Sequence, residues 1–257
     1  MTVLEVKNIA KQFGGITALT DVNFSVAEGE VFGLIGPNGA GKTTMFNIIT
    51  SMFPPTAGEI TFLGEKLNGL KPFEITKKGI CRTFQNIRLF PDMTVLENVT
   101  VGSHSRTGSG VWSSFFRTKK QKQEEAATRD RARSLLELVG LSEQADEFAD
   151  NLSYGQQRRL EIARALASDP KLLLLDEPAA GMNEKETNDL FDLIQKIKAR
   201  GITVVLIEHD MPLVMRICDR LAVLNFGREI ALGTPEEIRA NPEVIEAYLG
   251  KEEEDEK

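Results

Sequence analysis

The sequence predicts an α/β fold: a core built on buried strands, with an N-terminal antiparallel β subdomain and an inserted α-helical subdomain. Residues 31–35 form an apolar run that leads through a glycine-rich turn, residues 36–44, into a helical pattern. Residues 172–175 are four consecutive leucines, as expected of a parallel strand that is buried on both faces. The helical character of residues 92–165 predicts the inserted subdomain.

Composition indicates an ordinary globular protein of 257 residues, enough for one large α/β domain with a sizeable subdomain. Cys81 and Cys218 have no C-x-x-C spacing, so we expect reduced, buried thiols in a cytosolic protein. Residues 1–7 lack the apolar core of a signal peptide, and no apolar run reaches the roughly 18–20 residues that cross a bilayer. The net charge of −7 argues against nucleic acid as the main ligand. Any link to a membrane is therefore expected to run through a partner.

Short alternating strands are expected over residues 1–32, with Phe13 on a glycine-rich bend between two of them. Phe13 has two open interpretations. Its ring either packs within a turn or lies near a nucleotide and stacks on adenine.

Within residues 36–44, residues 36–43 match the pattern G-x-x-x-x-G-K-[ST] between a strand and a helix. Glycine lets the backbone approach a phosphate closely, and the N–H groups then form an anion nest at a helix N-terminus. Lys42 is expected to reach the β- and γ-phosphates, and the Thr43 hydroxyl to ligate Mg²⁺. The pattern predicts a nucleoside triphosphate site whose binding residues are Gly36, Asn38, Gly39, Ala40, Gly41, Lys42, Thr43 and Thr44.

The segment after this loop contains a strand over residues 59–64 and a polar Gln85, which by itself reads as a surface glutamine. Thr94 and Glu97 then form a capping box that opens the helical region. The basic cluster at residues 117–120 is interpreted as a solvated helix face rather than as a site for lipid headgroups.

Further polar residues stand at the ends of predicted elements. Ser153 is expected to cap the helix that follows it, either as a cap alone or as a second anion-binding device. Asp176 and Glu177 close the leucine run, at the edge where doubly wound sheets collect ligands. Asp176 could hold Mg²⁺ through water, and Glu177 could polarise the attacking water. His209 follows the next buried strand, residues 202–207, so a role at this same edge is favoured.

The remainder of the chain completes the domain. We expect a helix over residues 184–198, two short strands within residues 221–233 and one final helix over residues 235–249. The resulting single domain is divided into an α/β core with its β subdomain (1–91 and 160–233), a helical subdomain (about 92–159), a C-terminal helix (234–250) and a solvated acidic tail (251–257).

Together, these motifs resemble the ATP-binding subunit of an ABC transporter over nearly the whole chain. The resemblance implies a P-loop NTPase (RecA-like) core that binds ATP and Mg²⁺. It implies that Phe13 stacks on adenine, although the family more often has Tyr, and that Gln85 contacts Mg²⁺ or water. It also assigns Ser153 and Gly155 to the signature motif, where Tyr154 replaces the usual glycine.

The acidic edge has matching roles in that family. Asp176 corresponds to the Mg²⁺-associated aspartate, Glu177 to the catalytic base and His209 to the switch histidine at the γ-phosphate. Asn183 stands where the dimer-contact loop usually has Asp. The implied catalytic residues are Glu177, His209 and Gln85, and the implied metal-associated residues are Thr43, Gln85 and Asp176.

Residues 154–159 and 207–211 further resemble the Liv G-type ATPase of branched-chain amino acid importers. This implies a subunit at the cytoplasmic face of the cell membrane, peripheral through permease subunits. Its partners would be a second ABC ATPase subunit (a copy of itself or a sister), the permeases and, indirectly, an extracytoplasmic solute-binding protein, with no nucleic acid. Two subunits would face head to tail, with each ATP between the phosphate loop of one and Ser153 of the other. Gln85 with Ile87, Leu89, Phe90 and Met93 would line the groove that receives the permease.

Other functions stay open at this point. The transported solute could be another amino acid, an amide or urea. A soluble ABC protein acting on DNA or ribosomes would typically carry coiled-coil insertions or a second cassette, and neither is present. A P-loop switch GTPase would need a guanine signature N-K-x-D, which is not visible.

Overall fold

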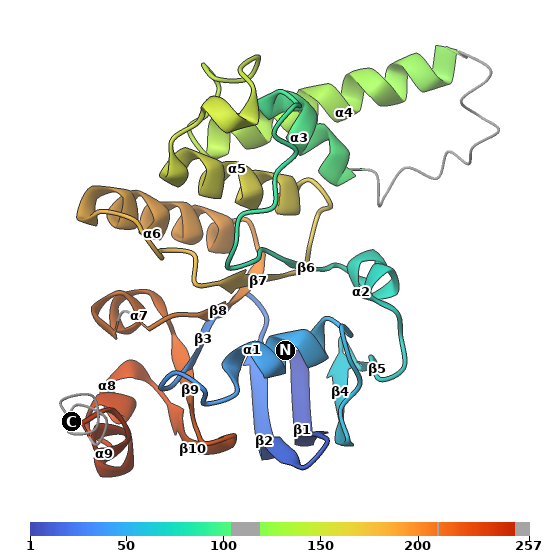
Figure 1. Ribbon diagram of the computed structural model, residues 1–257. Coiled ribbons are helices and arrows are strands. Elements are labelled where there is room, and N and C mark those ends of the chain that lie inside the picture. Colours follow the sequence, from blue (N-terminus) through green and yellow to red (C-terminus); the bar gives the residue numbers. More distant parts are fainter. Residues whose placement is uncertain (104–118, 210, 250–257) are drawn as a thin grey trace.

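The computed structural model describes residues 1–103, 119–209 and 211–249 (Figure 1). Within these residues, six strands form one sheet in the order β10-β9-β3-β8-β7-β6. Strands β3, β6, β7, β8 and β9 run parallel to one another, and β10 runs antiparallel to β9. The bounds are β3 (Val31–Ile35), β6 (Ile80–Arg82), β7 (Leu172–Asp176), β8 (Thr203–Ile207), β9 (Arg220–Asn225) and β10 (Arg228–Gly233).

A second, antiparallel sheet has four strands in the order β2-β1-β4-β5. They are β1 (Thr2–Phe13), β2 (Ile16–Ala27), β4 (Ala57–Phe62) and β5 (Glu65–Lys66). The helices are α1 (Lys42–Ile49), α2 (Pro72–Lys78), α3 (Val95–Gly102), α4 (Lys119–Leu138), α5 (Tyr154–Leu166), α6 (Glu184–Ala199), α7 (Met211–Ile217), α8 (Pro235–Arg239) and α9 (Pro242–Leu249).

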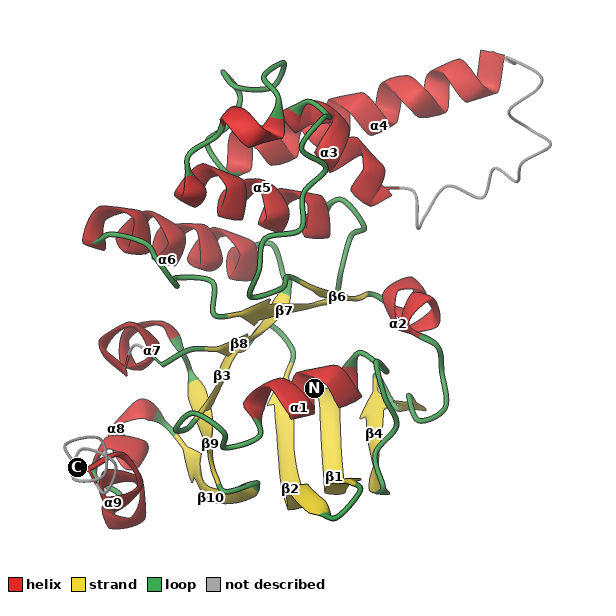
Figure 2. Cartoon of the chain, in the orientation of Figure 1, coloured by secondary structure: helices red, strands yellow, loops and turns green. Residues whose placement is uncertain are grey.

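Two hydrophobic clusters cover the two faces of the six-stranded sheet. Successive side chains of a strand point to opposite faces, so β7 contributes to both clusters. Leu172 and Leu174 pack with α1 and the antiparallel sheet, whereas Leu173 and Leu175 pack with α3, α4, α5 and α6. Figure 2 shows these helices stacked on one side of the sheet, with α1 and the second sheet on the other. The predicted fold class and the fully buried leucine strand are therefore confirmed.

Several predicted bounds differ from the structure. The N-terminal strands are longer than expected, because β1 and β2, each of 12 residues, form a hairpin on either side of the turn at Gly14. The expected C-terminal helix at 234–250 is two helices, since α8 ends before Pro242, which cannot continue a helix ladder. The predicted limit of the helical subdomain, between residues 159 and 160, falls inside the continuous helix α5.

Other sequence predictions fall on parts of the chain that are not described. Residues 117 and 118 of the basic cluster at 117–120, and all of the acidic tail at 251–257, lie outside the described residues. Among the residues that the structure describes, no helix is both long enough and apolar enough to span a membrane.

Candidate functional site

The loop between β3 and α1 has the backbone that the glycine pattern predicts. Gly36, Gly39 and Gly41 have φ angles of 145°, 80° and 105°, which disfavour any residue with a side chain. Space is equally restrictive, because a Cβ on Gly36 would lie 2.0 Å from the carbonyl oxygen of Leu224. Helix α1 begins at Lys42 without a side-chain cap from any described residue. Its first N–H groups therefore suit an anion held by backbone.

Lys42 is buried within this loop. Its Nζ donates hydrogen bonds to the carbonyl oxygens of Gly36 and Pro37, at 2.6 and 3.0 Å. Asn38 and Thr43 are exposed on the same loop. The loop thus presents one buried cation and a hydroxyl to any phosphate that it wraps.

The strand register brings the predicted acidic residues to the edge that carries this loop. On β8, Ile207 pairs with Leu34 on one side and with Asp176 on the other. Strands β3, β7 and β8 therefore end at the same level. Glu177 follows β7 directly and His209 stands two residues after the end of β8, so both lie at this edge with the loop.

Asp176 is 3% exposed and forms an ion pair that sequence reasoning missed. Nη2 of Arg82 donates to Asp176 Oδ2 at 2.7 Å, and Nη1 donates to Asn47 Oδ1 on α1 at 2.7 Å. Arg82 thereby fixes the carboxylate of β7 to the helix that follows the phosphate loop. The two residues come together because β6 and β7 are neighbours in the folded sheet, which the sequence does not show.

Glu177 has a strained backbone and a direct contact with Gln85. Its φ of 46° lies in the left-handed region, at a typical cost of about 1–3 kcal/mol for a non-glycine residue. The strand edge holds it there, since Glu177 N donates to Ile207 O at 3.0 Å. Nε2 of Gln85 donates to Glu177 Oε2 at 2.8 Å. The structure therefore brings together two of the three predicted catalytic residues.

His209, the third, has a largely exposed side chain, and its partner is Glu208. Nδ1 of His209 lies 3.9 Å from Glu208 Oε2. Burial raises the pKa of Glu208, which accepts hydrogen bonds from Ala179 N at 2.8 Å and from His209 N at 3.2 Å. This carboxyl group, also missed in the sequence, ties the segment after Glu177 to the segment that carries His209.

Phe13 lies at the end of β1 with 43% of its surface exposed. Its ring packs edge-on against Phe53 at a centroid distance of 5.1 Å, and Lys11 Nζ lies 4.9 Å from the ring centroid. The ring keeps an open face, and its stacking on adenine stays a prediction.

Ser153 caps α5, as predicted. Its hydroxyl accepts a hydrogen bond from Gln156 N at 3.4 Å, and Gln156 completes a capping box. A Cβ on Gly155 would lie 2.6 Å from Glu186 Oε1 on α6, so the end of that side chain would have to move to admit one. Helix α5 lies on the opposite side of the sheet from α1 (Figure 1). The structure therefore does not bring Ser153 and Gly155 to the phosphate loop of the same chain.

Asn183, the departure in the loop after Glu177, has a clear local role. Its Oδ1 accepts a hydrogen bond from Glu186 N at 3.0 Å and so caps α6. Asn and Asp are equally good at this position, so the substitution leaves the cap intact.

A magnesium ion fits the residues present only if a nucleotide supplies further ligands. The described residues hold no group of three or more His, Cys, Asp or Glu side chains suited to a metal. Mg²⁺ commonly takes one or two protein oxygens together with substrate phosphates. The hydroxyl of Thr43 and the carboxylate of Asp176 are such oxygens.

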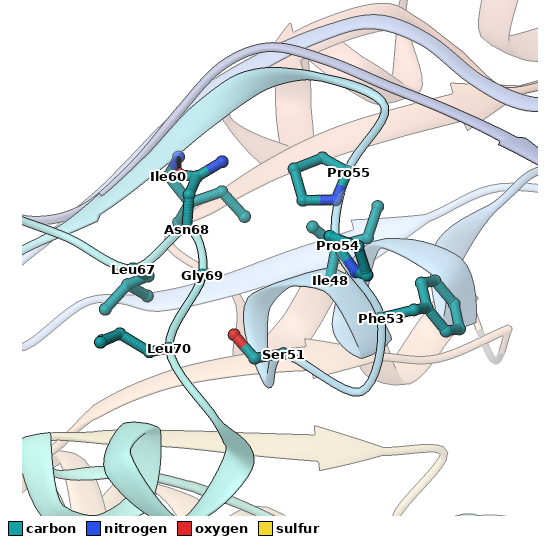
Figure 3. A pocket seen from close by; sticks show the side chains of 10 residues that line it. All are labelled: Ile48, Ser51, Phe53, Pro54, Pro55, Ile60, Leu67, Asn68, Gly69 and Leu70. Carbon is teal, nitrogen blue, oxygen red and sulfur yellow. Dashed lines mark hydrogen bonds between the residues drawn. The ribbon is translucent and has the colours of Figure 1, made fainter.

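A separate cavity of about 220 Å³ lies behind α1 (Figure 3). The segment with Leu67 and Leu70 faces the segment with Ser51 and Pro54, and the walls are mainly apolar. All of its lining residues fall between Ile48 and Leu70, and none of them is a site residue described above.

Comparisons with known proteins match this geometry. A family model described as "ABC transporter" matches residues 19–180, and one described as "Branched-chain amino acid ATP-binding cassette transporter" matches residues 228–254. The chain is 49% identical to the high-affinity branched-chain amino acid transport ATP-binding protein BraF of Pseudomonas aeruginosa, with 97% of this chain and 98% of BraF covered. It is 47% identical to LivG of Escherichia coli K12, with the same coverage.

Two solved structures extend the comparison. An ATP-binding cassette of an ABC transporter in its ADP conformation aligns with a TM-score of 0.85 at 37% identity, covering 97% of this chain and 99% of the other. A dimeric bacterial ABC transporter cassette aligns with a TM-score of 0.76 at 32% identity, covering 90% and 98%.

The pairing of Arg82 with Asp176 yields a stability prediction. The substitution Arg82→Met leaves a buried carboxylate without its partner, so the free energy of unfolding should fall by about 3–5 kcal/mol. Urea unfolding followed by circular dichroism measures it. Arg88→Met, at an exposed arginine of the same segment, is the control and should change stability by less than about 0.5 kcal/mol. Equal, small effects of both substitutions would contradict the assigned role of the ion pair.

Proposed function

Because this chain belongs to the family of ABC transporter ATP-binding proteins, we propose that it hydrolyses ATP to power an importer of branched-chain amino acids. The main support is the contact between Gln85 and Glu177 beside the phosphate loop. The named relatives and the family match at residues 228–254 support the solute class. Another amino acid, an amide or urea is the alternative cargo.

The phosphate loop binds the triphosphate in this proposal. Backbone N–H groups at the start of α1 and the buried Lys42 ammonium face the β- and γ-phosphates. Lys42 exchanges contacts with the carbonyls of Gly36 and Pro37 for contacts with phosphate oxygens. Phe13 offers its exposed ring face to adenine.

Hydrolysis is assigned to the acidic edge. Glu177 accepts the proton of the attacking water, and Gln85 holds the Glu177 carboxylate in place. His209, exposed at the next strand end, donates to the γ-phosphate. Thr43, Gln85 and Asp176 would hold Mg²⁺, which neutralises phosphate charge when it is bound.

The site in one chain is proposed to be half of a complete site. Transition-state charge on the γ-phosphoryl group needs donors from several sides. Ser153 and Gly155, at the start of α5, supply them from a second ABC ATPase subunit that faces this one head to tail. The dimeric cassette among the structural relatives supports this arrangement. That second subunit is either another copy of the chain or a sister ATPase.

A cavity of about 520 Å³ between α2, α3 and α5 is the proposed seat of a permease subunit. Leu89 and Phe90 line it together with Arg88 and Arg164, whereas Gln85, Ile87 and Met93, which were also expected, are not on its wall. Phe90 is 45% exposed, so an apolar partner side chain can cover it. Through this contact the subunit lies at the cytoplasmic face of the membrane, with an extracytoplasmic solute-binding protein acting on the far side.

The substitution Glu177→Gln tests the hydrolytic role. It keeps the shape of the side chain and removes the base, so ATP should bind within about threefold of normal affinity while turnover falls by about 10²-fold or more. Nucleotide binding and phosphate release measure the two effects. Glu184→Gln, at an exposed carboxylate of α6, is the control and should leave both unchanged. Near-normal turnover of the Glu177 variant would refute the assignment of the base.

The substitution Phe90→Glu tests the permease seat. A charge on the cavity wall should abolish co-purification with co-expressed permease subunits, since the buried contact would need to desolvate a carboxylate. ATP binding by the isolated subunit should be retained. Leu232→Glu, at an exposed residue of β10, serves as control. Undiminished co-purification of the Phe90 variant would exclude this surface.

A further inference from the structure

Helix α5 holds the Gln85 segment by a buried ion pair. Arg158 is fully buried, and its Nη1 and Nη2 donate to the carbonyl oxygens of Phe84 and Gln85, at 2.5 and 2.7 Å. Glu161, one turn further, pairs with Arg158 at 3.0 Å and accepts from Phe84 N and Arg88 N, at 3.3 and 3.4 Å. One face of α5 thus binds the backbone on both sides of Gln85.

Tyr154, the residue that replaces the usual glycine of the signature motif, completes this cluster. Its hydroxyl accepts a hydrogen bond from Nη2 of Arg158 at 3.1 Å, the same nitrogen that donates to Gln85 O. Its ring also lies beside the loop after Glu177, since a Cβ built on Gly181 would lie 3.3 Å from the ring. Tyr154 therefore bonds to the anchor of Gln85 and lies next to the loop that follows the base.

This cluster is a costly way to stabilise a fold. Burial raises the pKa of Glu161, and Nε of Arg158 has no hydrogen-bond partner among the described residues. Replacing a buried ion pair by apolar side chains of similar size often leaves the protein as stable or makes it more stable. Holding the surrounding groups in one conformation is the better-attested use of such a pair. The hydrogen bonds that Arg158 and Glu161 make to the backbone all go to one short segment, residues 84–88.

We propose that Arg158 and Tyr154 are positioning residues that make the contact between Gln85 and Glu177 depend on the position of helix α5. The path is short: Tyr154 fixes Arg158, Arg158 holds the Gln85 carbonyl, and the Gln85 side chain holds the Glu177 carboxylate. The inference rests on the proposed function, because it assigns α5 the task of reporting subunit closure to the base.

Closure of the two subunits and docking of the permease would then both act on the segment that Arg158 and Glu161 hold. The start of α5 carries Ser153 and Gly155, which face the second subunit in the proposed assembly. Arg88, at the other end of the anchored segment, lines the proposed permease cavity. Closure of the subunits and docking of the permease would both move the segment that holds Gln85.

Tyr154→Phe is the mildest test, because it removes one hydroxyl and keeps the ring against Gly181. In the assembled transporter, kcat for ATP hydrolysis should fall about threefold to tenfold while KM for ATP stays within twofold. The midpoint of thermal unfolding should be unchanged. Arg159→Gln on the same helix is the control, since Arg159 donates to Val139 O instead and should leave kcat unchanged. An unchanged kcat for Tyr154→Phe would overturn the proposal. So would a variant in which the midpoint of thermal unfolding falls and kcat and KM for ATP change together.

A double-mutant cycle tests whether Tyr154 acts through Arg158. Arg158→Gln combined with Glu161→Ala removes both charges and leaves no unpaired buried carboxylate. In that background, adding Tyr154→Phe should change kcat by less than 1.5-fold; an effect as large as in the native chain would contradict the proposed path. If the charge-free variant does not fold, the single Tyr154 variant decides the question. Failure of the proposed function would be seen in a different experiment, because the Glu177→Gln variant would then still hydrolyse ATP.

Discussion

Burial of the central strands on both faces is the constraint on which the rest of the structure depends. The side chains of β3, β7 and β8 are enclosed by the two hydrophobic clusters, so these strands can present polar chemistry only where they end. Their register places the three ends at one level. The phosphate loop, the acidic pair and His209 share one edge for this reason, although they are spread over more than 170 positions of the chain.

Three polar links hold the residues at this edge in place. Arg82 joins Asp176 to α1, Glu208 joins the loop after Glu177 to the His209 segment, and Gln85 joins Glu177 to the segment held by α5. The first two links use buried carboxylates, whereas the bond between Gln85 and Glu177 is exposed. The same arrangement leaves Ser153 on the far side of the sheet from the phosphate loop. A chain built in this way binds a nucleotide on one surface and offers the signature motif on another, which is why the proposed catalytic unit contains two subunits.

Local patterns predicted the parts of this structure that depend on neighbouring residues. The four leucines of β7, the glycine positions of the phosphate loop and the caps at Thr94 and Ser153 follow from periodicity, backbone freedom and short-range hydrogen bonds. The ion pair of Arg82 with Asp176 spans 94 positions, and the bond from Arg158 to Phe84 O spans 74. A single sequence carries no signal for such distant pairs, because their partners meet only after the sheet has formed. The division of the last helix into α8 and α9 depends on a local signal, since Pro242 is in the sequence and cannot continue the hydrogen-bond ladder of α8.

The central claim, that one chain holds half of the catalytic site, is tested most directly by comparing Ser153→Arg with Lys42→Ala. Equilibrium binding of ATP to the isolated subunit should be unchanged by Ser153→Arg and lost with Lys42→Ala, because only Lys42 lies in the chain's own phosphate loop. In the assembled transporter, ATPase activity should fall at least twofold with Ser153→Arg. The account would be contradicted if Ser153→Arg weakened ATP binding by the isolated subunit as severely as Lys42→Ala, or left the ATPase of the assembled transporter unchanged.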